Sequence, residues 1–230
     1  MHIYIKRSIR CGTPAINTGS ANDMLAADGV TYFKLQFDRA AAPSPWQLDE
    51  LRRWRTRLVN ARVVGQDAHR YGGVGFGNLS ARHPGRASAF IITGTQTGAR
   101  EVLGAHDFAV VTQVDLAHNH VIAHGGRAPS SEAMTHAVLY QADAAIEWVF
   151  HGHAPTLWRG AEQMRIASTP AEVGYGTPAM ALAVLAIRKR QPQLPALIRM
   201  GGHEDGIIAF GCTADSTGEL FEAALERAQR

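Results

Sequence analysis

Two histidines with one glycine between them, His151-Gly152-His153, are the residues in this chain that most directly suggest metal chemistry. They follow an apolar run, Trp148-Val149-Phe150, which is typical of a buried strand. Side chains at positions i and i+2 of a strand point to the same side, so both imidazoles would face one metal ion. The alternative is a pair of surface histidines where the strand frays, because His-x-His alone is a short motif.

A carboxylate next to two hydroxyls is the second candidate group, in Pro129-Ser130-Ser131-Glu132. Apolar residues at helical spacing follow, so Ser130 or Ser131 as N-cap predicts a helix that starts here, with Glu132 in its first turn. Such a positively polarised helix end suits anion binding and acid–base chemistry. The alternative is that Glu132 only interacts favourably with the helix dipole.

A glycine-rich segment over 71–80 and the loop Gly94-Thr95-Gln96-Thr97-Gly98 could together hold an anion. Glycines permit positive φ, so successive backbone N–H groups can curl around a negative group, and Ser80, Thr95 and Thr97 would add hydroxyl donors. The segment lacks the GxxxxGK[ST] pattern and is not a P-loop. A pair of tight β-turns is the alternative.

Two other polar clusters favour solvent-exposed surfaces. The helix predicted over 47–64 carries arginines opposite its apolar face, and we expect those arginines to be solvated. They are Arg52, Arg53, Arg55 and Arg57. A hairpin-like segment carries His118, His120 and His124 with no carboxylate at useful spacing, so a solvated hairpin is the favoured interpretation there.

The composition excludes several classes of protein. The chain has 230 residues, 46% of them hydrophobic, which is enough to bury a sizeable core. A net charge of +3, without Lys/Arg runs interleaved with aromatics, argues against nucleic-acid binding. Cys11 and Cys212 form no CxxC pair, so no disulfide framework is expected. Without an apolar signal core or a run long enough to span a membrane, we expect a cytoplasmic protein with no membrane partner.

The hydrophobic periodicity predicts one mixed domain. Residues 1–27 have weak periodicity and several turn formers, and we interpret them as an N-terminal arm before a domain over 28–230. The predicted strands lie near 31–37, 74–82, 89–93, 108–115, 117–123, 145–151 and 206–211. The predicted helices lie near 47–64, 130–141, 178–190 and 215–228.

Four ordered motifs together resemble the class II aldolase/adducin family. They are Gly77-Asn78-Leu79-Ser80-Ala81-Arg82, Ile91-Ile92-Thr93 with Thr97-Gly98, Pro129-Ser130-Ser131-Glu132 and His151-Gly152-His153. The resemblance runs from about Leu48 to near the C-terminus, and Gly174-Tyr175-Gly176-Thr177-Pro178 also looks like the family's segment before a helix. It implies an α/β fold of three layers, α/β/α, with a central and largely antiparallel sheet.

The resemblance also implies a metal site. His151 and His153 would bind Zn²⁺, or another divalent ion such as Mn²⁺, Fe²⁺ or Co²⁺. The third ligand would be His203, which follows a late strand. Glu204 and Asp205 stand where the family has glycine directly after this histidine, so Asp205 stays open as an alternative ligand. Three histidines leave a coordination position free, which is typical of a catalytic zinc site.

The same resemblance assigns the remaining site residues. Glu132 would be the catalytic acid–base, and the substrate- or anion-binding residues would be Asn78, Thr97, Gly98, Ser130 and Ser131. The loop from Gly94 to Gly98 is two residues longer than the family's usual loop, so whether the substrate is phosphorylated stays open. Tyr175 lies near the family's proton-donating tyrosine but is not assigned that role. Four arginines could meet an anionic group or lie at the surface: Arg82, Arg100, Arg127 and Arg159.

The function implied is that of a metal-dependent lyase acting on a small hydroxy-carbonyl, sugar-derived compound through a metal-stabilised enediolate. Epimerisation, dehydration or decarboxylation on the same metal site are close alternatives, because fold and site do not fix the reaction. A non-catalytic, adducin-like interaction domain is the alternative from a different class. Family members commonly form tetramers, so the resemblance also implies a homo-oligomer.

Overall fold

A ten-stranded mixed sheet is the centre of the structure, a computed structural model that describes residues 24–25, 32–40 and 47–230. The strands are β1 (Met24–Leu25), β2 (Lys34–Arg39), β3 (Asn78–Arg82), β4 (Phe90–Thr93), β5 (Phe108–Asp115), β6 (His120–Gly125), β7 (Trp148–His153), β8 (Ala167–Ser168), β9 (Ala196–Arg199) and β10 (Gly206–Gly211). Their spatial order is β1-β2-β6-β5-β4-β3-β7-β10-β9-β8. Only the β2–β6 and β8–β9 pairs are parallel, so the sheet is largely antiparallel, as predicted. The N-terminal arm predicted over 1–27 lies outside the described residues, apart from β1.

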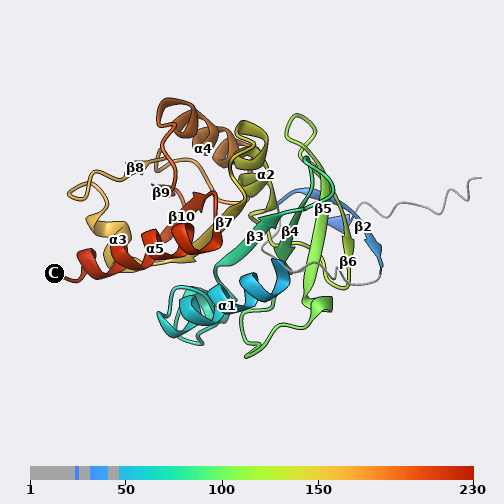
Figure 1. Cartoon of the computed structure of the whole chain (residues 1–230), viewed down its shortest axis with the longest axis horizontal. Helices are drawn as coiled ribbons and strands as arrows, with labels where there is room; N and C mark the ends of the chain where they lie inside the picture. Colours follow the sequence, from blue (N-terminus) through green and yellow to red (C-terminus); the bar gives the residue numbers. More distant parts are fainter. Residues whose placement is uncertain (1–23, 26–31, 41–46) are drawn as a thin grey trace, which may run out of the picture.

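Helices cover both faces of this sheet (Figure 1). They are α1 (Gln47–Asn60), α2 (Ala133–Ala142), α3 (Pro155–Gly160), α4 (Pro178–Arg190) and α5 (Ala214–Ala228). Helices α2 and α4 pack together on one face, and α1, α3 and α5 lie on the other. The three-layer α/β/α fold predicted from the sequence is therefore confirmed.

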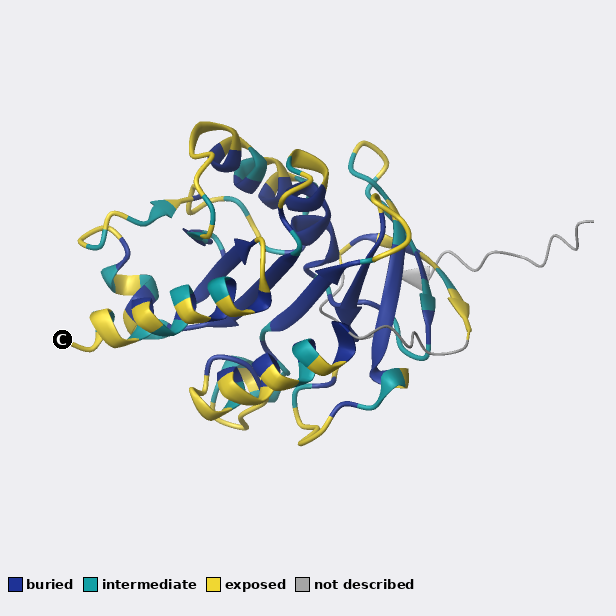
Figure 2. Cartoon of the chain, viewed as in Figure 1, coloured by how far each residue is buried: buried dark blue, intermediate teal, exposed yellow. Residues whose placement is uncertain are grey.

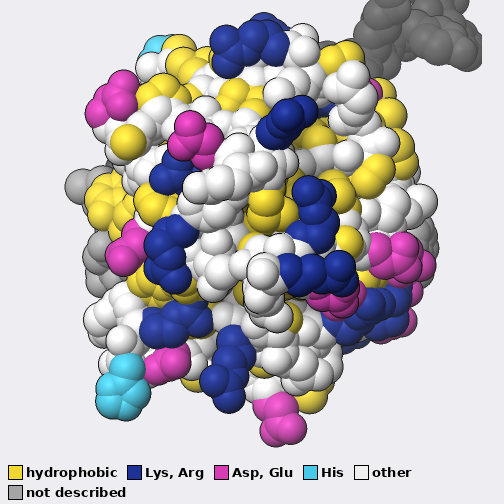
Figure 3. All heavy atoms as spheres, turned by 90° about the vertical axis from the view of Figure 1, so that its left-hand side faces the viewer, with side chains coloured by type: hydrophobic (Ala, Val, Ile, Leu, Met, Phe, Trp, Pro, Cys, Tyr) yellow, Lys and Arg dark blue, Asp and Glu magenta, His cyan; other side chains and the backbone are white. Residues whose placement is uncertain are grey.

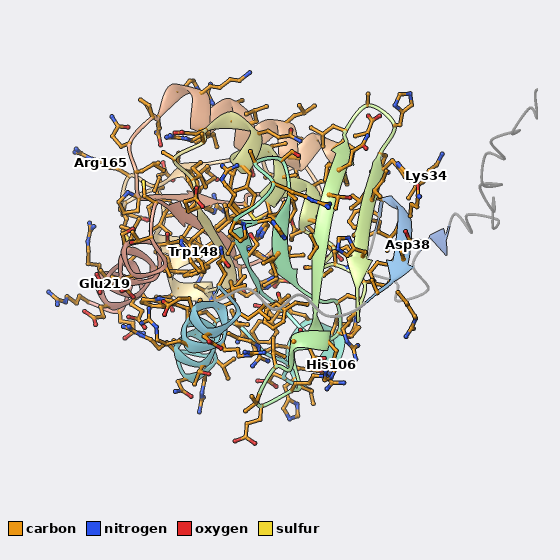
Figure 4. The ribbon with its side chains drawn as sticks, turned by 45° about the vertical axis from the view of Figure 1, so that its right-hand side comes forward. Lys34, Asp38, His106, Trp148, Arg165 and Glu219 are labelled. Carbon is orange, nitrogen blue, oxygen red and sulfur yellow. The ribbon has the colours of Figure 1, made fainter. Side chains whose placement is uncertain are left out.

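Strand β7 shows how the alternation of strand side chains builds the two cores. Val149 points into the core shared with α2 and α4, whereas its neighbour Phe150 points into the core shared with α1 and α5. All residues of β3, β4, β7 and β10 are buried, because these strands are covered on both faces (Figure 2). On β2, next to the edge strand β1, Lys34 and Asp38 are by contrast exposed (Figure 4).

Two predicted boundaries shift because of the backbone at the element ends. The helix predicted over 47–64 ends at Asn60, since Arg62 adopts a left-handed conformation (φ 60°) and Val63 N–H bonds back to the Leu58 carbonyl. The strand predicted over 74–82 begins only at Asn78, after a short 3₁₀ turn at Tyr71–Gly73.

The prediction that Ser130 or Ser131 caps α2 is wrong. The Ser130 carbonyl accepts a hydrogen bond from Ala133 N–H (3.1 Å), which makes a turn, and the helix starts only at Ala133. Glu132 is itself the N-cap residue and makes no side-chain cap bond. Its carboxylate is thereby free to point elsewhere. The sequence patterns also missed the short elements α3 and β8, whereas the late strand expected before His203 is β9.

The surface at the end of the molecule near the C-terminus is mixed in charge. Figure 3 shows Lys and Arg side chains there, interspersed with Asp, Glu and apolar groups. Among the described residues, no helix combines the length and the hydropathy needed to cross a membrane. Cys212 is exposed and makes no disulfide.

Candidate metal centre and active site

The sheet places His151 and His153 side by side on its most enclosed strand. Strand β7 lies between β3 and β10: His151 is paired with both neighbours, and His153 is paired with β10, so neither histidine lies at a frayed end. Gly152 is needed between them, because a Cβ there would lie 2.9 Å from the Val63 carbonyl and 3.1 Å from the Phe221 ring. The Val63 carbonyl approaches so closely because it accepts a hydrogen bond from His153 N–H (2.7 Å).

The turn between β9 and β10 brings His203 to this pair. Each of the three histidines offers one ring nitrogen, these nitrogens lie within 4.8 Å of one another, and all three residues are buried. Asp205 is not in this group: its carboxylate accepts a hydrogen bond from the Tyr71 hydroxyl (2.6 Å). Of the two alternatives left open by the sequence, the structure therefore brings His203 to the pair.

The chemistry of the three imidazoles fits a divalent metal. His151 Nδ1–H donates to the Ile207 carbonyl (3.0 Å), which leaves Nε2 with its lone pair directed elsewhere. His151 Nε2, His153 Nδ1 and His203 Nδ1 are buried without a hydrogen-bond partner. Burial lowers the pKa of His151 to about 4 and holds the pKa values of His153 and His203 well below the usual one. All three rings are thus neutral at physiological pH, the form that binds metals.

Glu132 lies beside this group. Its Oε1 is 3.5 Å from His203 Nδ1, and its Oε2 accepts a hydrogen bond from the Thr135 hydroxyl (2.8 Å). Burial raises the pKa of Glu132 to about 7, although the hydrogen bonds from Thr135 and from Gly176 N–H act in the opposite direction. A carboxyl group that titrates near neutrality can both accept and return a proton.

One cavity of about 350 Å³ brings together the candidate metal ligands, the candidate acid–base residue and the candidate substrate-binding residues. These residues are Asn78, Thr97, Gly98, Ser130, Ser131, Glu132, His151, His153 and His203. Ser80, expected to add a hydroxyl there, does not line it, because its Oγ is hydrogen-bonded to His136 Nδ1 (2.7 Å) and to the Tyr140 hydroxyl (2.7 Å). Asn78 lies directly opposite His151 in the pairing of β3 with β7, and its buried Oδ1 has no hydrogen-bond partner. The Thr97 hydroxyl donates to the Gly94 carbonyl (2.8 Å) and so stabilises the turn of the 94–98 loop.

The position of this loop depends on a buried arginine. Arg55, only 3% exposed, donates to the carbonyls of Thr97 (3.0 Å), Gly98 (3.3 Å), Arg100 (2.7 Å) and Glu101 (3.3 Å). The prediction that Arg55 faces solvent is therefore wrong. The loop covers this part of α1, and the backbone carbonyls of the loop accept hydrogen bonds from the Arg55 guanidinium. Its burial lowers the pKa of Arg55.

The four arginines considered as anion ligands do not line the cavity. Arg82 donates to four backbone carbonyls, and Arg100 and Arg127 form ion pairs with the buried Asp107. Arg159 lies on α3. In the described part of the chain, the cavity lining includes no lysine or arginine, so its donors are backbone N–H groups, hydroxyls, the Asn78 amide and the histidines.

The remaining histidine cluster is not a metal site in the structure. His118 is exposed and its Nδ1 contacts the Asp115 carboxylate at 2.8 Å, a partner that the sequence pattern did not indicate. His120 and His124 are half-buried on β6. Within the residues that the structure describes, the group of His151, His153 and His203 is the one arranged to hold a metal ion.

Sequence reasoning missed the aromatic walls of the cavity. Tyr175 stacks on the His203 ring (centroids 4.5 Å apart), and its hydroxyl lies 3.2 Å from that of Tyr32. Tyr71 and Phe76 both pack on the His153 ring. The available signal was weak: Tyr71, Phe76 and Tyr175 lie in glycine-rich segments, where periodicity does not show which way a side chain points.

The comparison of the chain with models of protein families agrees with the family resemblance of its sequence motifs. The model of the class II aldolase and adducin N-terminal domain matches residues 64–229. This chain belongs to that family. Among proteins with curated descriptions, none matches it.

Solved structures share this fold at low sequence identity. The L-fuculose-1-phosphate aldolase of Thermus thermophilus is 17% identical, with a TM-score of 0.57 over 79% of this chain and 90% of that one. The sugar-phosphate aldolase of Thermotoga maritima is also 17% identical, with a TM-score of 0.60 over 80% and 94%. YgbL of Klebsiella pneumoniae, for which an aldolase, epimerase or decarboxylase activity is suggested, is 20% identical, with a TM-score of 0.57 over 79% and 86%. At such identities the likeness shows the fold alone.

Proposed function

We propose that this protein is a metal-dependent lyase of the class II aldolase type, acting on a small hydroxy-carbonyl compound that is sugar-derived. The position of Glu132 carries the proposal: its carboxylate lies 3.5 Å from His203, in the same cavity as the three-histidine group. A buried carboxyl group costs stability unless it is fully hydrogen-bonded or paired, and Oε1 of Glu132 has no hydrogen-bond partner. A non-catalytic, adducin-like interaction domain would need neither this carboxyl group nor three unpartnered histidine nitrogens.

In this proposal the three histidines hold the divalent ion, which is Zn²⁺ or another ion such as Mn²⁺, Fe²⁺ or Co²⁺. When bound, such an ion polarises a substrate carbonyl and stabilises negative charge on its oxygen. Glu132 takes up a proton from the substrate and returns it: its burial raises its pKa, and the charge of a bound divalent ion would act in the opposite direction. Tyr175 and Phe76 limit the access of water from the sides of the cavity.

The polar lining orients the substrate. Asn78 and the serines Ser130 and Ser131 offer side-chain groups on one side of the cavity, and Thr97 and Gly98 lie on the loop that Arg55 supports. The side chains of Asn78, Ser130 and Ser131 can donate hydrogen bonds to hydroxyls of a sugar chain or to an anionic end group. The Thr97 hydroxyl, by contrast, donates to the Gly94 carbonyl and can only accept.

Metal analysis and one substitution test the proposal. The purified protein should hold close to one equivalent of divalent metal, and less than half an equivalent would count against it. Glu132→Gln should retain the metal, because Glu132 is not one of the three ligands, and should lower kcat by about 10²–10⁴-fold. A Glu132→Gln variant as active as the wild type would overturn the acid–base role.

The substrate panel decides between related reactions. The activities of the wild type and of Glu132→Gln should be measured on aldol, epimerase, dehydratase and decarboxylase substrates. All these reactions use proton transfer next to a polarised carbonyl, so the substitution should lower whichever activity is found.

We also propose that the protein forms a homo-oligomer, a tetramer, which light scattering on the purified protein would test. A monomer at micromolar concentration would contradict it.

A further inference from the structure

Three residues outside the histidine group join the two segments that carry its members. The Tyr71 hydroxyl donates to Asp205 Oδ2 (2.6 Å) and accepts from Arg70 (2.8 Å). Arg70 also donates to the carbonyls of Arg62 (2.9 Å) and of His153 (3.3 Å). These contacts form one continuous chain of hydrogen bonds from the end of β7 to the turn between β9 and β10.

Each end of this series of hydrogen bonds lies close to a histidine of the candidate metal site. On the β7 side, the Tyr71 ring packs edge-on against His153, with centroids 4.5 Å apart and planes at 67°. On the other side, Asp205 lies two residues after His203 in the same turn, and its carbonyl accepts from Ala154 N–H (2.8 Å). The side chain and the backbone of Asp205 therefore both connect the His203 turn to the neighbourhood of His153.

The backbone at the Tyr71 end of the Tyr71–Asp205 hydrogen bond is in an unfavourable conformation. Tyr71 has φ 49°, in the left-handed region that bulky residues seldom adopt, whereas Asp205 (φ 61°) belongs to a residue type that tolerates this region. Strained backbone of this kind persists only where surrounding contacts over-determine it, and it concentrates at functional sites. Here the contacts are the hydrogen bond itself and the guanidinium of Arg70, which lies over the rings of Phe76 (4.4 Å) and Tyr71 (5.0 Å).

The same contacts give a reason for the two residues between His203 and Gly206. Glu204 and Asp205 lengthen this turn relative to the histidine-glycine turn that the family resemblance leads one to expect. Asp205 uses the extra length to reach Tyr71, whereas Glu204 is exposed at the cavity.

We propose that Arg70, Tyr71 and Asp205 are positioning residues that hold His153 and His203 at the spacing required to bind one metal ion. This inference rests on the proposed function, because it assigns the three residues to the metal site of that function. They act through the histidines and touch neither metal nor substrate in the proposal. Groups that orient metal ligands commonly change metal affinity by about 10–100-fold when they are removed.

Metal affinity, measured without any substrate, tests the inference. The full-length protein, stripped of metal with a chelator, would be titrated with Co²⁺ and with Zn²⁺ against a competing chelator, and the visible spectrum of the Co²⁺ form would report ligand geometry. Tyr71→Phe keeps the ring on His153 and removes only the hydroxyl, and Asp205→Asn keeps the shape and tolerates the left-handed backbone. Each should weaken metal binding by about 10–100-fold and shift the Co²⁺ spectrum.

Two further variants sharpen the result. The double variant Tyr71→Phe/Asp205→Asn should bind metal no more weakly than the single variant with the lower affinity. Both substitutions act on the same hydrogen bond: Tyr71→Phe removes its donor, and Asp205→Asn replaces its charged acceptor by a neutral amide oxygen. Glu219→Gln makes the same kind of change at an exposed position of α5 outside the cavity and leaves the Tyr71–Asp205 bond in place, so it should bind metal within about twofold of the wild type. Circular dichroism would show that each variant is folded.

The outcomes separate this inference from the function it rests on. A wild type that binds metal, together with Tyr71→Phe and Asp205→Asn variants of unchanged affinity, would overturn the positioning role and leave the proposed function standing. Losses that add up in the double variant, or an equal loss of metal affinity in Glu219→Gln, would also overturn it. A wild type that binds neither Co²⁺ nor Zn²⁺ would overturn the proposed function and the positioning role together.

Discussion

Replacement of Arg55 by methionine should destabilise the protein far more than the same replacement at Arg57, two positions later on α1. Methionine keeps most of the aliphatic volume but removes the guanidinium, which donates hydrogen bonds to backbone carbonyls of the 97–101 segment. Arg57 forms an ion pair with Glu222 at the surface, where its side chain is 42% exposed. The pair of variants therefore compares a buried arginine with an exposed one on the same helix.

The size of the effect follows from the individual hydrogen bonds. The bonds to Thr97 (3.0 Å) and Arg100 (2.7 Å) are short, and those to Gly98 and Glu101 are long at 3.3 Å. An unsatisfied buried carbonyl costs about 1–3 kcal/mol, so the loss of two good bonds corresponds to about 3–4 kcal/mol. Removal of a desolvated charge offsets part of this cost, which leaves about 3 kcal/mol. The exposed ion pair of Arg57 is worth about 1 kcal/mol or less.

Urea unfolding followed by tryptophan fluorescence is the assay. With an m-value of about 3 kcal/mol/M, the midpoint of Arg55→Met should fall by about 1 M and that of Arg57→Met by about 0.3 M or less. The m-values should match the wild type if both variants unfold in one step. Equal midpoint shifts for the two variants would refute the argument that Arg55 supports the loop from within.

Three further predictions concern the metal, a glycine and an aromatic wall. Removal of bound metal with a chelator should lower the free energy of unfolding, by about 4 kcal/mol relative to protein in which the free ion exceeds Kd about a thousandfold. Calorimetry should show a lower Tm that added Zn²⁺ restores. An unchanged Tm would contradict a metal centre. Gly98→Ala should cost about 2–3 kcal/mol, because its Cβ would lie 2.3 Å from the Gly65 carbonyl oxygen. Gly160→Ala, with nothing within 4 Å, is its control and should change stability by about 1 kcal/mol or less. Tyr175→Ala should weaken Zn²⁺ binding by about 3–10-fold, because it removes the ring that stacks on His203. Tyr175→Phe keeps this ring and should bind Zn²⁺ as the wild type does. Equal Zn²⁺ affinities of the two variants in a chelator competition would disprove this role.

The parts of the site that sequence reasoning located follow local rules. His151 and His153 share a side because strand side chains alternate, and this holds wherever the strand lies in the sheet. The strand itself ends two residues later than predicted, which places both histidines within the paired ladder. The assignment of Glu132 came from the family resemblance, and its place in the cavity did not depend on the helix start, which was misjudged.

The parts that were missed depend on contacts between distant segments. The side chains of Tyr71 and Asp205 meet across 134 positions of the chain, and no local pattern reports such a contact. Arg55 has the periodicity of a solvated arginine, and only the fold shows that the 97–101 segment covers it. Predicting such residues requires knowledge of which loop lies over which helix.

The central position of β7 has a consequence for how fast the protein folds. His151 bonds to Ile207 of β10, 56 positions later in the chain, and Asn78 on its other side lies far earlier. Closing such long loops before their contacts form slows folding, so refolding on the millisecond-to-second scale is expected. His203 reaches His151 and His153 through the pairing of β7 with β10, so we expect a metal ion to find its full ligand set only after this pairing. Bound metal should therefore lengthen the lifetime of the native state and leave the refolding rate unchanged.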